Sequence, residues 1–278
     1  MSTPTRLRAL VRVLLAVTLA MGVLMGLLWT LQRQLIYYPD PTQVPSAADV
    51  IAGARDVTLH TDDGLELRAW FVPAPQESAI DMAVLFAPGN GGNRLGRADF
   101  AVQLRRRGFA VLLMDYRGYG GNPGAPSEDG LAADALAAAQ ALEELGYPPE
   151  RTIYFGESLG TGVVATLQAK RPPAGMVLRS PFTELADVGA HHYPWLPVRL
   201  LLRDRFPVLE LVEHSEVPLT VVYGDRDVVV PTELSARVAD GAASLVEELV
   251  LEGADHNDGV MFGARVADAV ARLAGRVR

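Results

Sequence analysis

The chain has 278 residues, 49% of them hydrophobic, with a formal net charge of −8 and no cysteine. This length and composition suffice for one large core, and the acidic balance argues against a nucleic-acid partner, because phosphate binding needs a clustered Lys/Arg surface. The lack of cysteine excludes disulfides, thiolate metal ligands and a cysteine nucleophile.

An uncharged apolar run without proline extends over residues 13–31, and these nineteen residues would span the hydrocarbon core of a bilayer as a helix. Three arginines precede the run, whereas Arg33 is the one positive charge close after it. The positive-inside rule therefore predicts a cytoplasmic tail over residues 1–8, a transmembrane signal anchor over 9–31, and a domain on the extracytoplasmic side. The alternative is a cleaved signal peptide, although no small-residue cleavage site follows the run.

The rest of the chain is expected to form one domain. Residues 32–55 contain three prolines and are predicted to be a linker and a short ordered approach to a domain over 56–278. Two stretches of alternating hydrophobicity, 56–61 and 65–72, are joined by Asp-Asp-Gly. An Asp-Gly pair between such stretches indicates an antiparallel β-hairpin, which would form one edge of a sheet.

Short apolar runs alternate with helical stretches beyond the hairpin. This alternation predicts an α/β fold with a mostly parallel central sheet and helices on both faces. The segment 182–216 breaks the alternation with three prolines and the run YPWLPVRLLL. We predict that it is a small helical cap over the carboxyl ends of the strands, where such sheets place their ligand crevice. The predicted strands are 82–87, 110–115, 151–156, 175–178, 219–223 and 247–251, and the predicted helices are 98–107, 130–145 and 159–170.

The sequence GESLG around Ser158 matches the pattern G-x-S-x-G. An apolar strand enters the motif and a helical run leaves it, and this context forces the serine into a strained turn that exposes its hydroxyl. The helix N-terminus would direct its positive dipole end toward a developing oxyanion. The alternative is a serine that caps the helix of an ordinary βα unit. We predict that Ser158 is a nucleophile.

A serine hydroxyl needs a general base. Of the five histidines, His256 alone follows the last predicted strand, and a chain order of serine, acid, histidine is the expected one. A carboxylate must hold the histidine in the correct tautomer. Asp225 and Asp227 both follow the preceding strand, and the residues alone do not separate them. Glu184 and Asp187 are a weaker third option.

The glycine-rich loop PGNGGN follows the strand 82–87. The backbone N–H groups of Asn90 and Leu159 would together form an oxyanion hole. The alternative is a glycine-rich turn without a catalytic role. This chemistry needs no metal and no organic cofactor.

Several motifs combine in one recognisable set: LIYYPDP at Leu35, APGNGGN at Ala87, GESLGTG at Gly156, YGDRDVVVP at Tyr223 and GADHND at Gly253. Together they resemble the α/β-hydrolase fold family, and in particular its membrane-anchored branch of depalmitoylase-type and bacterial enzymes. The resemblance covers roughly residues 32–275 and is specific for fold and mechanism, not for substrate.

The resemblance favours one acid over the other. In such proteins the acid is the aspartate three residues after the glycine and four before the proline, which corresponds to Asp227. Two positions depart from the family: Pro88 stands where histidine is usual, and Asp255 where glycine is common.

The resemblance implies a serine hydrolase that cleaves an ester or thioester in two steps through an acyl-enzyme. A membrane tether and an apolar cap would suit a small-molecule or lipid-like acyl substrate, with Tyr193, Trp195 and Leu196 as candidate contacts. Alternatively, these side chains only pack the cap onto the domain. Two other functions remain open: a serine peptidase on the same fold, and a non-catalytic membrane-held scaffold, which would be expected to lack the nucleophile, base or acid.

Overall fold

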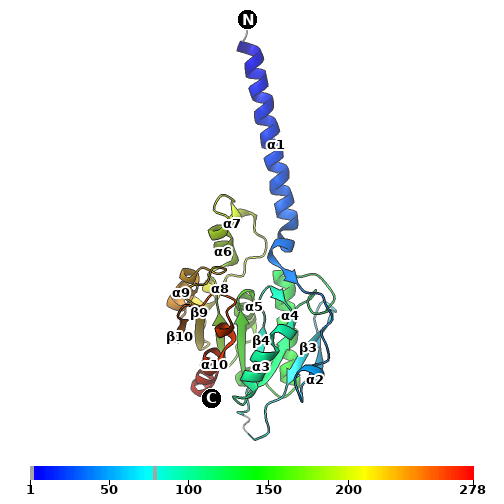
Figure 1. Ribbon diagram of the computed structural model, residues 1–278, viewed down its shortest axis with the longest axis vertical. Helices are drawn as coiled ribbons and strands as arrows, with labels where there is room; N and C mark the ends of the chain where they lie inside the picture. The colour runs from blue at the N-terminus through cyan, green and yellow to red at the C-terminus, as the bar shows by residue number, and fades with distance from the viewer. Residues whose placement is uncertain (1–2, 78–79) are drawn as a thin grey trace. The chain divides into compact units, whose positions relative to one another are not determined.

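The computed structural model describes residues 3–77 and 80–278, and the chain divides into two compact units between Tyr37 and Tyr38. The described part of the first unit is one helix, α1 (Thr3–Ile36) (Figure 1). Its segment Arg8–Ile36 is long and apolar enough to cross a membrane, and a window of 18 residues within it has a mean hydropathy of 2.3. The helix continues past the predicted end at residue 31 because no proline or glycine interrupts the sequence until Pro39.

The second unit contains a sheet of eight strands among the described residues, in the order β10-β9-β8-β7-β4-β6-β3-β2. All neighbouring pairs are parallel except those of β3, which runs antiparallel to both β2 and β6. The α/β prediction and the edge hairpin are therefore confirmed. The strands are β2 (Arg55–His60), β3 (Glu66–Val72), β4 (Ala83–Ala87), β6 (Ala110–Met114), β7 (Thr152–Glu157), β8 (Gly175–Arg179), β9 (Leu219–Gly224) and β10 (Leu245–Leu251).

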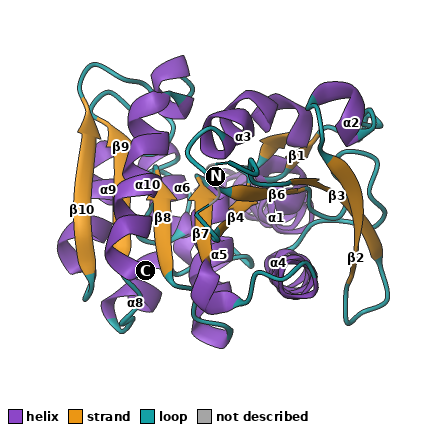
Figure 2. Ribbon diagram, turned by 90° about the horizontal axis from the view of Figure 1, so that it is seen from below, coloured by secondary structure: helices purple, strands orange, loops and turns teal. Residues whose placement is uncertain are grey.

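Helices cover both faces of this sheet (Figure 2). Helices α3 (Ala98–Arg105) and α10 (Ala264–Val277) pack together on one face, and α4 (Glu128–Glu144) and α5 (Leu159–Lys170) pack together on the other. The central strands are buried on both faces, which explains their continuous apolar runs. Between the sheet and α3 lie three rings that pack stacked, tilted or edge-to-face with centroids 4.9–6.0 Å apart: Phe86, Phe100 and Phe155.

The domain unit begins earlier than the predicted residue 56. The segment that was expected to be a linker contains β1 (Tyr38–Pro39), which pairs with β5 (Gly91–Gly92), and the short helix α2 (Ala47–Val50). Ala47 and Ile51 are buried in the main core. These contacts make residues 38–55 part of the compact unit and not only an approach to it. The helix α9 (Thr232–Gly241) was also not predicted.

The predicted cap of residues 182–216 contains α6 (Leu185–His192), α7 (Val198–Leu201) and α8 (Val208–Glu213). Only its first part projects from the domain, where α6 and α7 stand above the other elements of the unit (Figure 1). The second part is packed down: Phe206 is buried against Gly162 of α5, and α8 packs on the same helix. Glu128 of α4 accepts hydrogen bonds from the backbone of Arg205 and Phe206, at 2.5 and 2.7 Å, and fixes the return of the chain.

Candidate active site

Ser158 occupies a strained turn between the central strand β7 and helix α5. Its φ of 51° and ψ of −115° are unusual for a residue other than glycine. Such strain costs about 1–3 kcal/mol and persists only where the surrounding structure imposes it. The N–H of Ser158 donates to the carbonyl of Arg179 on β8 at 2.8 Å, which holds the turn. The serine therefore stands at the carboxyl end of β7, directly before the first turn of a helix.

The two glycines of the GESLG motif permit this turn to pack closely. A Cβ added at Gly156 would lie 2.6 Å from the carbonyl oxygen of Gly160, and one added at Gly160 would lie 2.2 Å from that of Ala87. Real Cβ atoms do not approach backbone oxygens so closely. The contact of Gly160 with the end of β4 brings the first turn of α5 against the start of the loop 88–93.

His256 and Asp227 form a buried hydrogen-bonded pair on two neighbouring loops. Nδ1 of His256 lies 2.7 Å from Oδ2 of Asp227, and the two side chains are 7% and 0% exposed. Oδ1 of Asp227 accepts hydrogen bonds from the N–H groups of Val229 and Val230 at 3.0 and 2.8 Å. The ring is thus held through Nδ1, so that Nε2 is the nitrogen that could act as a base.

The Asp227 carboxyl carries a negative charge next to the His256 ring. Burial raises the pKa of the Asp227 carboxyl, but the hydrogen bond and positive charge of His256, together with the N–H of Val230, outweigh burial and hold that pKa below its usual 3.8. The carboxylate is therefore ionised at neutral pH. It can orient the imidazole and stabilise an imidazolium ion.

The structure separates Asp225 from Asp227, which the residues alone, without the family resemblance, left open. Asp225 accepts a hydrogen bond from the N–H of Gly253 at 2.6 Å, so its carboxylate serves the backbone and not the imidazole. Asp255, the departure from the family pattern, accepts from the N–H groups of Val228 and His256 at 2.9 and 2.7 Å and joins the two loops. The remaining histidines are exposed: His60, His191, His192 and His214.

Two buried tyrosines hold the glycine-rich loop. The hydroxyl of Tyr116 donates to the carbonyl of Pro88 at 2.8 Å, and the hydroxyl of Tyr119 donates to that of Asn90 at 2.9 Å. The loop lies against the N-terminus of α5 through the contact of Gly160 described above. The structure therefore brings Asn90 and Leu159, the two predicted oxyanion-hole residues, to the same end of the sheet.

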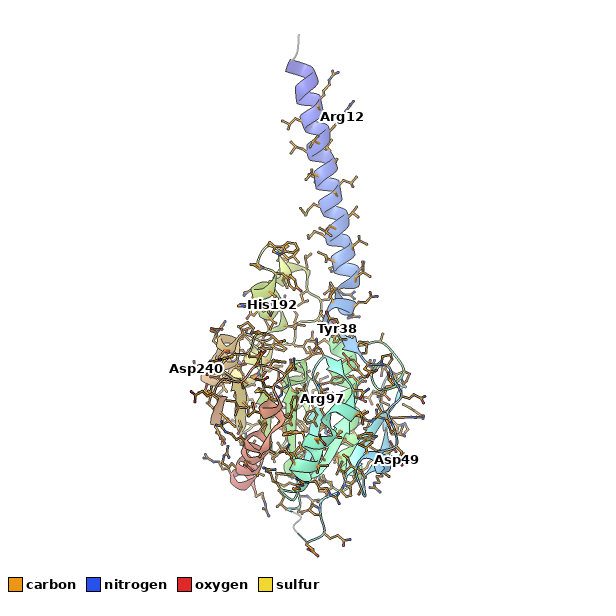
Figure 3. All side chains as sticks on the ribbon, viewed as in Figure 1. Arg12, Tyr38, Asp49, Arg97, His192 and Asp240 are labelled. Atoms are coloured by element: carbon orange, nitrogen blue, oxygen red, sulfur yellow. The ribbon has the colours of Figure 1, made fainter. Side chains whose placement is uncertain are left out.

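Next to the Ser158 turn lies a buried group of charges that sequence reasoning missed. Arg97 donates to both carboxylate oxygens of Glu157, at 2.6 and 3.0 Å, and Nη2 of Arg179 lies 3.2 Å from the same carboxylate. Glu157 and Arg179 are at most 4% exposed, and Arg97 is 16% exposed; Figure 3 labels Arg97 in the middle of the domain. We call these three residues the ionic cluster. The available signal was a charged residue at the end of each of two buried apolar strands, β7 and β8.

Glu157 is ionised within this cluster. Burial alone would raise the pKa of its carboxyl, but the charges of Arg179 and Arg97 and the hydrogen bonds from Arg97 outweigh burial, so that the pKa lies below the usual 4.5. A negative charge therefore stands one residue before Ser158.

The predicted substrate contacts lie between α6 and α7. Tyr193 and Trp195 are 53% and 69% exposed and Leu200 on α7 is 87% exposed, whereas Leu196 is half-buried. We call Tyr193, Trp195 and Leu200 the cap tip. More than half of the surface of each of these residues is therefore exposed. His192, labelled in Figure 3, lies beside the cap tip and hydrogen-bonds through Nε2 to the carbonyl of Val229, two residues after Asp227.

Glu184 and Asp187, the third option for the acid, belong to the cap. Asp187 pairs with Arg199 at 2.5 Å, and Glu184 lies 3.9 Å from Arg205. Their carboxylates thus serve the cap itself.

Comparison with known proteins identifies several relatives. A family model described as serine aminopeptidase, S33, matches residues 78–211. An uncharacterised protein of Mycobacterium tuberculosis is 48% identical over 248 residues, which are 88% of either chain. A lysophosphatidylserine lipase of Danio rerio is 33% identical over 197 residues, which cover 63% of this chain and 50% of the lipase.

Solved structures show the same fold. An esterase of Pyrococcus furiosus superimposes with a TM-score of 0.69 over 87% of this chain and 99% of the esterase. The two sequences are 20% identical, so the likeness concerns the fold.

Proposed function

The chain belongs to the α/β-hydrolase family, and from this membership we propose that it is a membrane-anchored serine hydrolase that cleaves carboxylic esters or thioesters of lipid-like or acylated molecules. The observation that carries the proposal is the combination of a strained Ser158 at the end of β7 with a buried His256–Asp227 pair at the same edge of the sheet. Ordinary helix capping needs neither the strain nor the pair.

The proposed reaction is acyl transfer in two steps. Nε2 of His256 takes the proton of Ser158 while the serine oxygen attacks the acyl carbonyl, and the N–H groups of Asn90 and Leu159 stabilise the oxyanion. The imidazolium then protonates the leaving alcohol or thiol, and an ester to Ser158 remains. Water, activated by His256, releases the acid and restores the serine.

Two observations support a lipid-like substrate. A relative with 33% identity is named a lysophosphatidylserine lipase, and the cap carries exposed apolar side chains beside the loop of Asp227. An acyl chain of a membrane-derived molecule would cover such side chains favourably. Tyr193, Trp195 and Leu196 are the proposed contacts.

The membrane anchor is α1, with the N-terminus in the cytoplasm and the hydrolase domain on the other side. Support comes from the length and hydropathy of the helix and from the arginines before it. Protease is added to cells whose outer envelope has been opened by osmotic shock while the membrane that holds α1 stays closed. It is expected to digest the domain. Protection of the domain until the inner membrane is broken would contradict this topology.

A fluorophosphonate probe tests the mechanism on the full chain in detergent. Wild-type protein is expected to be labelled, and Ser158→Ala is expected to lose the label while the protein stays folded by circular dichroism. Folded wild-type protein that takes no label would refute the serine hydrolase proposal. A panel of p-nitrophenyl esters of increasing chain length then tests the substrate class, and hydrolysis of the acetyl ester alone would contradict a lipid-like substrate.

A serine peptidase is the second candidate, because the matching family model is described as a serine aminopeptidase. The same labelled serine would serve both activities. Aminoacyl p-nitroanilides, added to the panel as amide substrates, distinguish them: cleavage faster than that of all esters would favour the peptidase.

A further inference from the structure

Arg179 of the ionic cluster binds the backbone on both sides of the proposed chemistry. Its carbonyl accepts the N–H of Ser158 at 2.8 Å, and its Nη1 donates to the carbonyl of His256 at 2.9 Å. Its Nη2 is paired with Glu157 at 3.2 Å. One side chain, fully buried, thus connects the residue before the nucleophile with the backbone of the proposed base.

The other two members reach the glycine-rich loop. A Cβ added at Gly89 would lie 3.1 Å from Oε1 of Glu157, and one added at Gly92 would lie 3.0 Å from Nη1 of Arg97. The carboxylate and the guanidinium therefore lie directly against the backbone on either side of Asn90. The loop can neither move toward the cluster nor gain side chains there without disturbing it.

Phe262 adds a third connection. The Cζ atoms of Arg179 and Arg97 lie 4.4 and 6.0 Å from the centroid of its ring. Phe262 ends η3 (Gly259–Phe262), the short helix that follows His256 on the same loop. Cation–π attraction to two guanidiniums holds this loop to the cluster from a second side.

Stability alone does not account for the cluster. Each buried ion costs several kcal/mol in lost hydration, and well-packed apolar residues commonly stabilise a fold as well or better. Within the cluster two positive charges share one carboxylate, and the further negative charge that acts on Arg179 is that of Asp227, the partner of His256. What the cluster supplies that apolar residues would not is direction, because a guanidinium holds several oxygens at defined angles.

We propose that the ionic cluster is a positioning device for the active site. Arg179, held by Glu157 and stacked on Phe262, fixes the backbone of Ser158 and His256 relative to each other, and Arg97 with Glu157 fixes the loop of Asn90 against both. None of the contacts described for the three is to the Ser158 hydroxyl or to the His256 ring, so we assign them as positioning residues and not catalytic ones. This inference rests on the proposed function of Ser158 and His256.

Two substitutions of Arg179 test the proposal on the full chain in detergent. Arg179→Gln leaves Arg97 and Glu157 as a neutral, doubly hydrogen-bonded pair, so that no unpaired charge is buried. Arg179→Lys keeps the charge but not the forked geometry. Both are expected to lower kcat on p-nitrophenyl butyrate, and the rate of fluorophosphonate labelling, by about 100-fold with KM nearly unchanged, because small misplacements of reacting groups have effects of this size.

Arg117→Gln is the matched control. Arg117 is buried and pairs with Asp134 at 2.8 Å and with Asp63 at 2.7 Å, and none of the contacts described for it involves the ionic cluster, Ser158 or His256. It is expected to lower the melting temperature at least as much as Arg179→Gln does, because it leaves the buried Asp134 carboxylate without its guanidinium, while kcat stays at the wild-type value. A loss of kcat in Arg117→Gln equal to that in Arg179→Gln would reduce the effect to general destabilisation and overturn the proposal.

Three further results would also support or overturn the positioning role. Wild-type kcat in Arg179→Lys would show that charge suffices, and would overturn the positioning role. If neither variant of Arg179 folds, Phe262→Leu replaces them, because it keeps every charge and removes the ring; a roughly tenfold loss of kcat supports the proposal, and no loss overturns it. Absence of labelling in wild-type protein refutes the proposed function itself and is thereby distinguished from a failure of this inference.

Discussion

The ionic cluster and the cap tip differ in how far their side chains are buried and paired, although both belong to one domain. The cluster buries three charged side chains, each of which has a partner at a defined distance. The cap tip exposes two aromatic residues and a leucine. In the cluster, contacts between individual atoms, such as that of Arg179 with the carbonyl of His256, hold the backbone of the proposed site in place. At the cap tip, only the apolar character of the surface is specified.

From this difference we expect substitutions in the two regions to affect different kinetic quantities. Substitutions in the buried part of the site should change the chemical step at constant KM, because they displace reacting groups. Substitutions at the cap tip should change the preference among substrates and leave the chemical step intact, because they alter only the apolar area offered to a ligand.

The largest expected effect concerns the buried acid. Asp227→Asn should lower kcat about 10,000-fold on p-nitrophenyl butyrate, because an amide would hold His256 in the wrong tautomer. Asp225→Asn, in which only the hydrogen bond to Gly253 is affected, should leave kcat close to the wild-type value. A larger loss in Asp225→Asn than in Asp227→Asn would reverse the assignment of the acid.

Stability should also distinguish the interior from the cap tip. Phe155→Ala removes a fully buried ring that stacks on Phe86 at 4.9 Å and should lower the free energy of unfolding by about 3–5 kcal/mol. Leu200→Ala at the cap tip should change it by no more than about 0.5 kcal/mol. Chemical denaturation monitored by circular dichroism measures both. A cost for Leu200→Ala comparable to that of Phe155→Ala would mean that the cap tip is a packed element.

A smaller effect is expected on chain-length preference. Trp195→Ser should lower kcat/KM for a p-nitrophenyl ester with a long acyl chain about tenfold, since covering one large apolar side chain contributes about 1.5 kcal/mol. The acetyl ester should be unaffected. Val250→Ser, at a 40% exposed position on the edge strand β10, is the control and should change neither. Equal losses on short and long esters would place Trp195 outside substrate recognition.

The smallest effect is one of pH on stability. The pKa of Glu157 in the folded protein lies below its usual 4.5, because Arg179 and Arg97 outweigh burial. The stability that its charge contributes is therefore present above pH 4.5 and is lost as the pH falls through the lower folded pKa.

Glu157→Gln should accordingly melt below wild type at pH 7, and the gap in melting temperature should narrow as the pH falls below 4.5. Thermal scans in a series of buffers measure the gap. A gap that stays constant with pH would mean that the carboxylate contributes through shape and not through charge.

The order of strands and helices was predictable because the signals are local. Continuous apolar runs mark strands that are buried on both faces. The motif around Ser158 contains its own turn, since Gly156 contacts atoms of the same βα unit and Gly160 contacts the end of the neighbouring strand β4. The position of His256 followed from chain order alone. The start of the domain was not predictable, because the burial of Ala47 and Ile51 depends on a core assembled from distant strands.

What the sequence by itself determined is therefore the α/β fold, the strained serine and the single histidine after the last strand. The tertiary structure decided which aspartate meets that histidine, because Asp225 and Asp227 follow the same strand and differ in the residue of the loop after β10 that each one meets, Gly253 or His256. It also assembled the ionic cluster, whose members Arg97 and Glu157 are 60 residues apart. Pairing over such a separation depends on which strands become neighbours in the sheet, and a charged residue at the end of a strand does not reveal its partner until the sheet has formed.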